Sequence, residues 1–173
     1  MFQYVEDKEF VSHMRYFCGS LMQELCHTLK EEFDIGANFN LIGSGAKNLI
    51  LQNASEPIDL DYNLEILRCN DFEDCREIKE CVRKAFDMVL KDNNFPACQD
   101  STSVLTTRPF YFSEGNPTEF SIDIGIVAKN DSGLHRLIHR KTGIMQDDNY
   151  YWNLAPSSKD VSKKAEYIKS KGS

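Results

Sequence analysis

The chain has 173 residues, 41% of them hydrophobic and 27% charged, which fits one globular domain that buries about 70% of its unfolded surface. No apolar run approaches the roughly 18 residues of a membrane-spanning helix, and the acidic start MFQYVEDKEF is unlike a secretory signal. The net charge of -7 argues against a protein whose whole surface binds nucleic acid, although a local basic groove is compatible with it. We therefore expect one cytoplasmic, soluble domain over residues 1–173. The six cysteines form no CxxC pair, so we expect free thiols.

The first predicted element is a long helix from Asp7 to Phe33. Apolar residues recur there every three or four positions and form one buried stripe. A short strand over 38–42 then runs into a glycine-serine turn at 43–45, and residues 46–52 follow as a short helix. The next segment, 58–67, alternates between apolar and polar residues, which is typical of a strand with one buried face.

A second amphipathic helix is predicted from a capping box at Asn70 and Glu73 to about Asp92, with Phe72 on its buried face. Two further strands, 103–112 and 119–128, are expected to form a hairpin, with Pro109 indicating an edge or a bulge. Residues 134–143 follow as a short strand or a basic turn, and 159–170 as a C-terminal helix. The expected fold is an α+β domain, with a mixed β-sheet of about four or five strands and helices packed on one face.

Three aspartates stand on the polar faces of the predicted strands. Asp59 and Asp61 alternate with the apolar residues of the first strand, and Asp123 occupies the same kind of position in FSIDIGIV. If these strands are neighbours, the three carboxylates meet on the open side of the sheet, where Gly125 leaves room for a ligand. Clustered carboxylates need a counter-charge and suit Mg²⁺, which completes its coordination with substrate phosphates. Two such ions would hold the attacking and leaving oxygens of an in-line displacement.

The turn that precedes these strands has the composition of an anion-binding loop. Gly43 and Gly45 allow close approach of the backbone, Ser44 can donate to a phosphate oxygen, and Lys47 can pair with its charge. A solvated helix position is the alternative for Lys47.

Two more segments each leave two interpretations open. A basic group near the end of the chain would receive a triphosphate or RNA, or would protect a strand edge: His135, Arg136, His139, Arg140 and Lys141. The aromatic run Tyr150, Tyr151 and Trp152 would pack in the core or a lid, or would form a platform for base stacking.

Together, LIGSG, PIDLDY and FSIDIG resemble the motifs of the nucleotidyltransferase superfamily over residues 39–127. The resemblance implies that Gly43 and Ser44 hold the β and γ phosphates of a nucleoside triphosphate such as ATP. It implies that Asp59, Asp61 and Asp123 bind Mg²⁺, two ions in all with Mn²⁺ as an alternative, and that Asp123 helps to deprotonate the acceptor. The implied enzyme moves a nucleoside monophosphate from the triphosphate to an acceptor hydroxyl and releases pyrophosphate.

The sequence departs from the family pattern in three respects, one of which is that NLILQNASEP lacks the arginine or lysine often found in this part of the motif. Fourteen residues separate Ser44 from Asp59, which is long for the motif, and about fifty residues follow Asp123, too few for a separate helical domain. We therefore expect a minimal transferase or part of a longer protein that works with a partner subunit or a further domain. The alternative function is a non-catalytic nucleotide-binding or antitoxin-like module. The acceptor hydroxyl, on a small molecule, a protein or RNA, and the preferred base are left open.

Overall fold

The computed structural model describes residues 8–42, 57–144 and 148–154. These ranges contain two long helices, α1 (Lys8–Phe33) and α3 (Cys75–Asp92), and a mixed sheet of seven strands. The strands are β1 (Gly36–Ile42), β2 (Ile58–Arg68), β3 (Gln99–Asp100), β4 (Leu105–Thr106), β5 (Phe120–Asn130), β6 (Gly133–Arg140) and β7 (Asn149–Leu154). The α+β class is confirmed, and the described sheet has more strands than the four or five expected.

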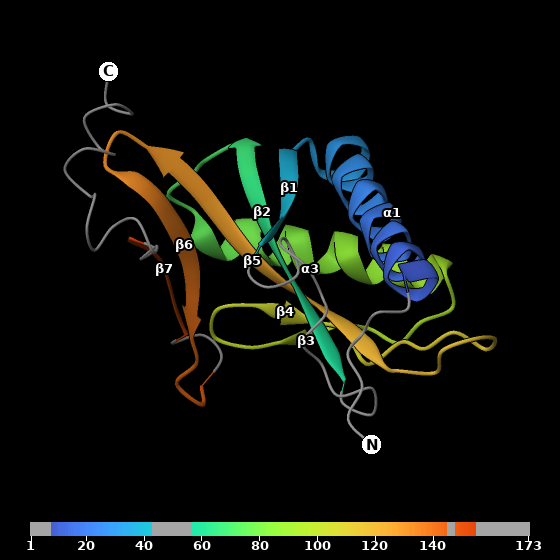
Figure 1. Ribbon diagram of the computed structural model, residues 1–173. Helices are drawn as coiled ribbons and strands as arrows, with labels where there is room; N and C mark the ends of the chain where they lie inside the picture. The colour runs from blue at the N-terminus through green and yellow to red at the C-terminus, as the bar shows by residue number, and fades with distance from the viewer. Residues whose placement is uncertain (1–7, 43–56, 145–147, 155–173) are drawn as a thin grey trace, which may run out of the picture.

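The sheet is built around two parallel central strands, β2 and β5. Its main order is β1-β2-β5-β4-β3, while β6 pairs with β5 and carries β7 at its outer edge. The long strand β5 pairs with β4 around Asp123 and with β6 from Val127 onward, so the β6–β7 pair extends the sheet to one side (Figure 1). In the same view α3 passes behind β2 and β5, with α1 beside it, and the helices therefore cover one face of the sheet.

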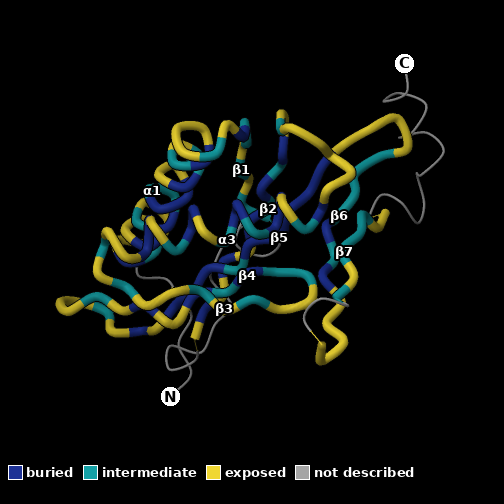
Figure 2. Tube along the Cα trace, turned by 180° about the vertical axis from the view of Figure 1, so that it is seen from behind, coloured by how far each residue is buried: buried dark blue, intermediate teal, exposed yellow. Residues whose placement is uncertain are grey.

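The alternation predicted for the central strands is what separates the two faces. In β2 the apolar positions from Ile58 to Ile66 are buried, while Asp59 and Asp61 are exposed. The buried row packs against one stripe of α1, which runs from Phe10 to Leu29 as predicted. Figure 2 shows this buried layer between the helices and the sheet. The core thus takes one face of the sheet and leaves the carboxylates on the other.

The start of the second helix differs from the prediction. The N-cap is Asp74, whose side chain accepts a hydrogen bond from the Glu77 amide at 3.1 Å, so the capping box at Asn70 and Glu73 was wrong. Asp71 instead accepts from the Glu73 amide at 2.9 Å and closes a turn ahead of the helix. As a result Phe72 lies in this turn and is 39% exposed, although the periodicity placed it on the buried helix face.

The second half of the sheet also differs in detail. The strand predicted over 103–112 is reduced to two residues in β4, because Pro109 has no amide to donate and only an isolated bridge joins Phe110 to Phe120. The basic segment forms a true strand, β6, and the aromatic run forms the edge strand β7, which periodicity did not predict. The short helix predicted at 46–52 and the C-terminal helix at 159–170 lie outside the described residues.

All six cysteines are free, as the sequence predicted. In the described part of the chain neither helix has the length and apolar character that crossing a bilayer requires. The cytoplasmic location stays a prediction.

Candidate active site

The three predicted carboxylates lie on the open face of the two central strands. Asp61 of β2 stands directly opposite Asp123 of β5 in the parallel register, and Asp59 stands opposite Ser121. Neighbouring strands are about 4.8 Å apart, so this register places the side chains of each pair next to one another. The structure therefore brings Asp61 and Asp123, which the sequence could place only on separate strands, side by side, with Asp59 two residues before Asp61 on the same face.

The negative charges of this group act on one another. Partial loss of solvent around the carboxylate raises the pKa of Asp61, although the residue as a whole is exposed, and the charges of Asp123 and Asp59 raise this pKa further. The positive charge of Arg136 acts in the opposite direction. A carboxyl whose pKa is raised by like charges is characteristic of a site that gains from a bound cation.

Ser121 orients one of the carboxylates. Its hydroxyl donates to Oδ1 of Asp59 at 2.7 Å, and the serine itself is buried. The sequence placed Ser121 on the polar face of its strand but gave no signal of this contact, because the partner is 62 residues away.

Arg136 occupies the space beside the aspartates. It lies opposite Val127 in the β5–β6 register and extends its guanidinium across Gly125, so close to the backbone that a Cβ atom at this glycine would collide with Nη1. The same group donates to Oδ1 of Asn63 at 3.4 Å. Burial lowers the pKa of Arg136 and the charge of Asp61 raises it. The room that Gly125 was expected to leave for a ligand is thus filled by an arginine.

The donor set fits a divalent cation in its chemistry but not yet in its arrangement. Within the described residues no three His, Cys, Asp or Glu side chains are grouped closely enough to hold a metal ion. Asp59 is turned toward Ser121, and Asp61 and Asp123 face one another across the two strands. Three carboxylates on one face, two of them in direct register, are nevertheless the oxygen ligands that Mg²⁺ prefers. Rotation of side chains, with no change of the backbone, would present them to one ion.

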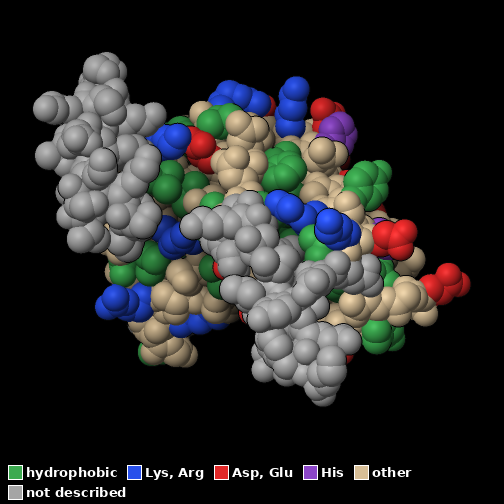
Figure 3. Space-filling view, viewed as in Figure 1, with side chains coloured by type: hydrophobic (Ala, Val, Ile, Leu, Met, Phe, Trp, Pro, Cys, Tyr) green, Lys and Arg blue, Asp and Glu red, His purple; other side chains and the backbone are tan. Residues whose placement is uncertain are grey.

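The remaining predicted site residues are divided between places. Gly43, Ser44, Gly45 and Lys47 lie outside the described residues. The basic segment is split by strand alternation: Arg136 and Arg140 share the open face, while the imidazole of His139 is buried on the helix side between Asp100 and Asp148. Figure 3 shows Lys and Arg side chains spread over the visible face rather than gathered in one patch.

The arrangement of helices and strands matches that of known nucleotide-binding structures. Vibrio cholerae DncV in its 3'-deoxy ATP bound form aligns with a TM-score of 0.50 and 12% identity, over 86% of this chain and 40% of that chain. The chain has the nucleotidyltransferase fold. Other similar structures are CdnC of E. coli MS115-1 with ATP, with a TM-score of 0.49, 18% identity and coverage of 97% and 48%, and the CD-NTase CdnG of Bradyrhizobium diazoefficiens with GTP, with a TM-score of 0.47, 13% identity and coverage of 81% and 39%.

The likeness is confined to the fold. The chain spans less than half the length of each of these structures. The sequence matches no protein-family model, and comparison with curated proteins gives no match. The support for a site in this chain therefore comes from its own carboxylates on the parallel strands β2 and β5.

Proposed function

We propose that the protein is a metal-dependent nucleotidyltransferase that moves a nucleoside monophosphate from a nucleoside triphosphate to an acceptor hydroxyl. The observation that carries the proposal is the register that sets Asp61 opposite Asp123, with Asp59 two residues before Asp61 on the same face. The fold supports it, and the matched DncV structure holds 3'-deoxy ATP, so we propose ATP or another nucleoside triphosphate as the donor. We also propose that residues 1–173 form one domain of this kind.

In the proposed reaction the acceptor oxygen attacks the α phosphorus, the bond from that phosphorus to the bridging oxygen breaks, and pyrophosphate leaves. Asp123 takes the proton of the acceptor hydroxyl. Asp59, whose carboxylate accepts from Ser121, would bind the metal together with Asp61 and Asp123. Bound there, Mg²⁺ would neutralise the charge of the triphosphate and of the leaving group. Gly43, Ser44, Gly45 and Lys47 are proposed to hold the distal phosphates.

The test measures two products from nucleoside triphosphates labelled in the α phosphate, in the presence of Mg²⁺ or Mn²⁺: pyrophosphate by an enzyme-coupled assay, and labelled nucleoside monophosphate joined to the acceptor. We expect Asp61→Asn and Asp123→Asn each to lower the rate by at least about 100-fold, since even the outer partners of a metal site are worth 10- to 100-fold. Glu65→Gln is the matched control, because Glu65 stands on the same strand and face but opposite Val127. Its rate should stay within about twofold of the unaltered protein.

The destination of the label identifies the acceptor. Label in a small molecule, in protein or in RNA would distinguish the three classes of hydroxyl that the sequence left open. One result would overturn the proposed enzymatic activity and favour the non-catalytic module. In that case Mg²⁺-dependent binding of nucleotide is lost in Asp61→Asn, but no acceptor mixture gives release of pyrophosphate.

A further inference from the structure

A hollow of about 650 Å³ lies away from the carboxylates, between the turn ahead of α3 and the strands β5, β6 and β7. Ala128 and His135 are cross-strand partners in its wall. Positions in β5 alternate between the two faces, so Ala128 belongs to the helix side and Asp123 to the open side. The hollow is therefore separated from the proposed catalytic site by the sheet.

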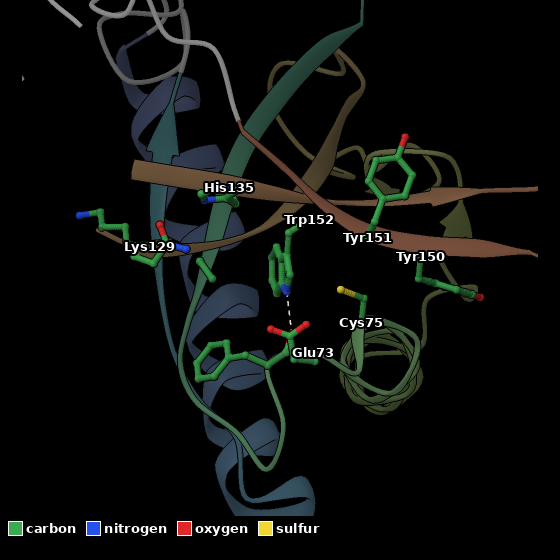
Figure 4. A pocket seen from close by; sticks show the side chains of 10 residues that line it. Glu73, Cys75, Lys129, His135, Tyr150, Tyr151 and Trp152 are labelled. Atoms are coloured by element: carbon green, nitrogen blue, oxygen red, sulfur yellow. Dashed lines mark hydrogen bonds between the residues drawn. The ribbon is translucent and has the colours of Figure 1, made fainter. Parts of the chain in front are cut away.

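Two aromatic rings that line this hollow, those of Trp152 and Phe72, keep part of their surface open to a ligand. Trp152 reaches from β7 toward the turn (Figure 4), where its Nε1 donates to the main-chain carbonyl of Phe72 at 2.7 Å. Tyr150 is already enclosed, with the His139 ring 4.1 Å away on one side and the Arg76 guanidinium 4.4 Å from its ring. Among the described residues no ring or cation stacks on Trp152 or Phe72. The indole is thus fixed in orientation and packs in part against the core, while the rest of its surface faces the hollow.

Polar groups from three elements surround these rings. His135 uses Nδ1 in a 3.1 Å contact with the Gly133 carbonyl, which leaves Nε2 without a partner in the described part of the chain. Lys129 at the end of β5 and Glu73 in the turn are exposed, and their side chains make no hydrogen bond or ion pair with described residues. Figure 4 shows Glu73 beside the indole of Trp152, and Lys129 on the border of the hollow with its ammonium group directed away from the indole. A ligand can therefore find donors and a carboxylate acceptor around an aromatic surface.

We propose that this hollow binds a purine nucleoside or its monophosphate, at a site separate from the catalytic one. Every nucleobase has a flat π-face that can stack on an aromatic side chain, and a nucleoside fits a cavity of this size. The Glu73 carboxylate can accept from the N–H groups of the base, and the long Lys129 side chain, turned round the end of β5, can pair with one phosphate. The acidic residues Asp71, Glu73 and Asp74 of the same turn disfavour a triphosphate, because its charge would meet theirs. The site does not depend on the proposed activity.

The ligand chemistry follows from the mixture of groups. A purely apolar ligand would leave Glu73, His135 and Lys129 without partners after desolvation. An inorganic anion would make no use of the two rings. A flat heterocycle with its own donors satisfies both parts of the wall.

The protein reports on this site through its own fluorescence, because Trp152 is the only tryptophan in the chain. Guanosine, GMP, adenosine, AMP and GTP are titrated in Mg²⁺-free buffer while Trp152 emission and the NMR signal of its indole N–H are followed. We expect saturable changes in both signals with a purine nucleoside or monophosphate, and weaker binding of GTP. Phe72→Ala should weaken the binding about tenfold or more, since stacking on one ring is worth about 1–3 kcal/mol per base. Tyr16→Ala, which removes an exposed ring on α1, should leave it unchanged.

Two variants separate the parts of the proposal. Lys129→Gln should weaken GMP several-fold more than guanosine, and equal effects on the two would overturn the assignment of the phosphate to Lys129. Asp61→Asn should retain the signal, whereas its loss would show that Trp152 reports on the catalytic face and would overturn a separate site. No saturable change at millimolar nucleoside, or a response to tetramethylammonium in place of purines, would also overturn the proposal. Pyrophosphate release is measured independently, so failure of one proposal is distinguishable from failure of the other.

Discussion

Arg136 links the carboxylates to the rest of the open face. Its guanidinium lies over Gly125, contacts Asn63 and favours the ionised form of Asp61. The positive charge of Arg136 offsets part of the repulsion among the carboxylates when no metal ion is bound. The same charge is well placed to meet an anionic substrate. At the scale of single residues, the ionisation of Asp61 therefore depends on the positive charge of Arg136 as well as on the two neighbouring carboxylates.

We predict that Arg136→Gln raises the pKa of Asp61, because the positive charge that lowers it is removed while burial and the two neighbouring carboxylates remain. Titration of the Asp61 carboxyl carbon by NMR in metal-free protein measures this directly. In the activity assay the acid limb of the pH profile should move to higher pH, since only ionised Asp61 can bind the metal. Arg140→Gln is the control, because Arg140 shares the strand and face but contacts Tyr151. An unchanged pKa of Asp61 in Arg136→Gln would contradict the inference that Arg136 favours the ionised form of this carboxyl.

At the scale of elements, a buried ion-pair network joins α3 to the outer strands. Lys79 of α3 is 2% exposed, and its Nζ lies 2.8 Å from Oδ1 of Asp100 in β3. His139 of β6 lies between Asp100, at 3.2 Å, and Asp148, at 2.8 Å. The hydrogen bond from His139 is also the largest cause of the lowered pKa of Asp148. Through these contacts the two-residue strand β3 is held in the sheet although its backbone pairing is minimal.

We predict that Asp100→Asn lowers the free energy of unfolding by about 3 kcal/mol, because it leaves the buried Lys79 ammonium without its counter-charge. Urea unfolding at neutral pH measures the difference. Asp34→Asn makes the same chemical change in the exposed pair with Arg68, whose side chains are 86% and 53% exposed, and should change stability by less than about 1 kcal/mol. Asparagine also tolerates the φ of 55° at this position. An Asp100→Asn effect as small as that of Asp34→Asn would show that the network contributes little.

The elements that could be predicted are those with a regular period. The stripe of α1 and the alternation of β2 and β5 were sufficient to place Asp59, Asp61 and Asp123 on one face. The register between β2 and β5 could not be predicted, because residues 62 apart in sequence decide it. A local signal for Lys79 did exist, since it shares the apolar face of its helix with Cys75, Ile78 and Val82. Its partner Asp100 lies in a strand too short to show any period.

At the scale of the whole molecule, the neighbouring carboxylates on the open face of the sheet lower the stability of the metal-free protein. Because burial and like charges hold the folded-state pKa of Asp61 above its ordinary value of 3.8, the folded protein binds a proton more tightly there than the unfolded chain does. Stability from this group therefore falls as pH rises from the unfolded to the folded pKa. The penalty is absent below the unfolded pKa and is complete above the folded pKa. A bound cation would remove this penalty, because its charge offsets the repulsion among the carboxylates.

This leads to a prediction in which the order of two proteins reverses. In metal-free buffer at neutral pH, Asp61→Asn should unfold at a slightly higher temperature than the unaltered protein, because the neutral amide escapes the repulsion of Asp59 and Asp123. With Mg²⁺ and ATP at 100 times their dissociation constant, the unaltered protein should gain about 2.7 kcal/mol by mass action, and Asp61→Asn should gain far less. Thermal unfolding followed by circular dichroism shows both effects. Glu65→Gln should follow the unaltered protein in both buffers. If Asp61→Asn is the less stable protein without metal, or if Mg²⁺ and ATP stabilise it equally, then the carboxylates on β2 and β5 do not form a site whose cost in stability is recovered by its ligand.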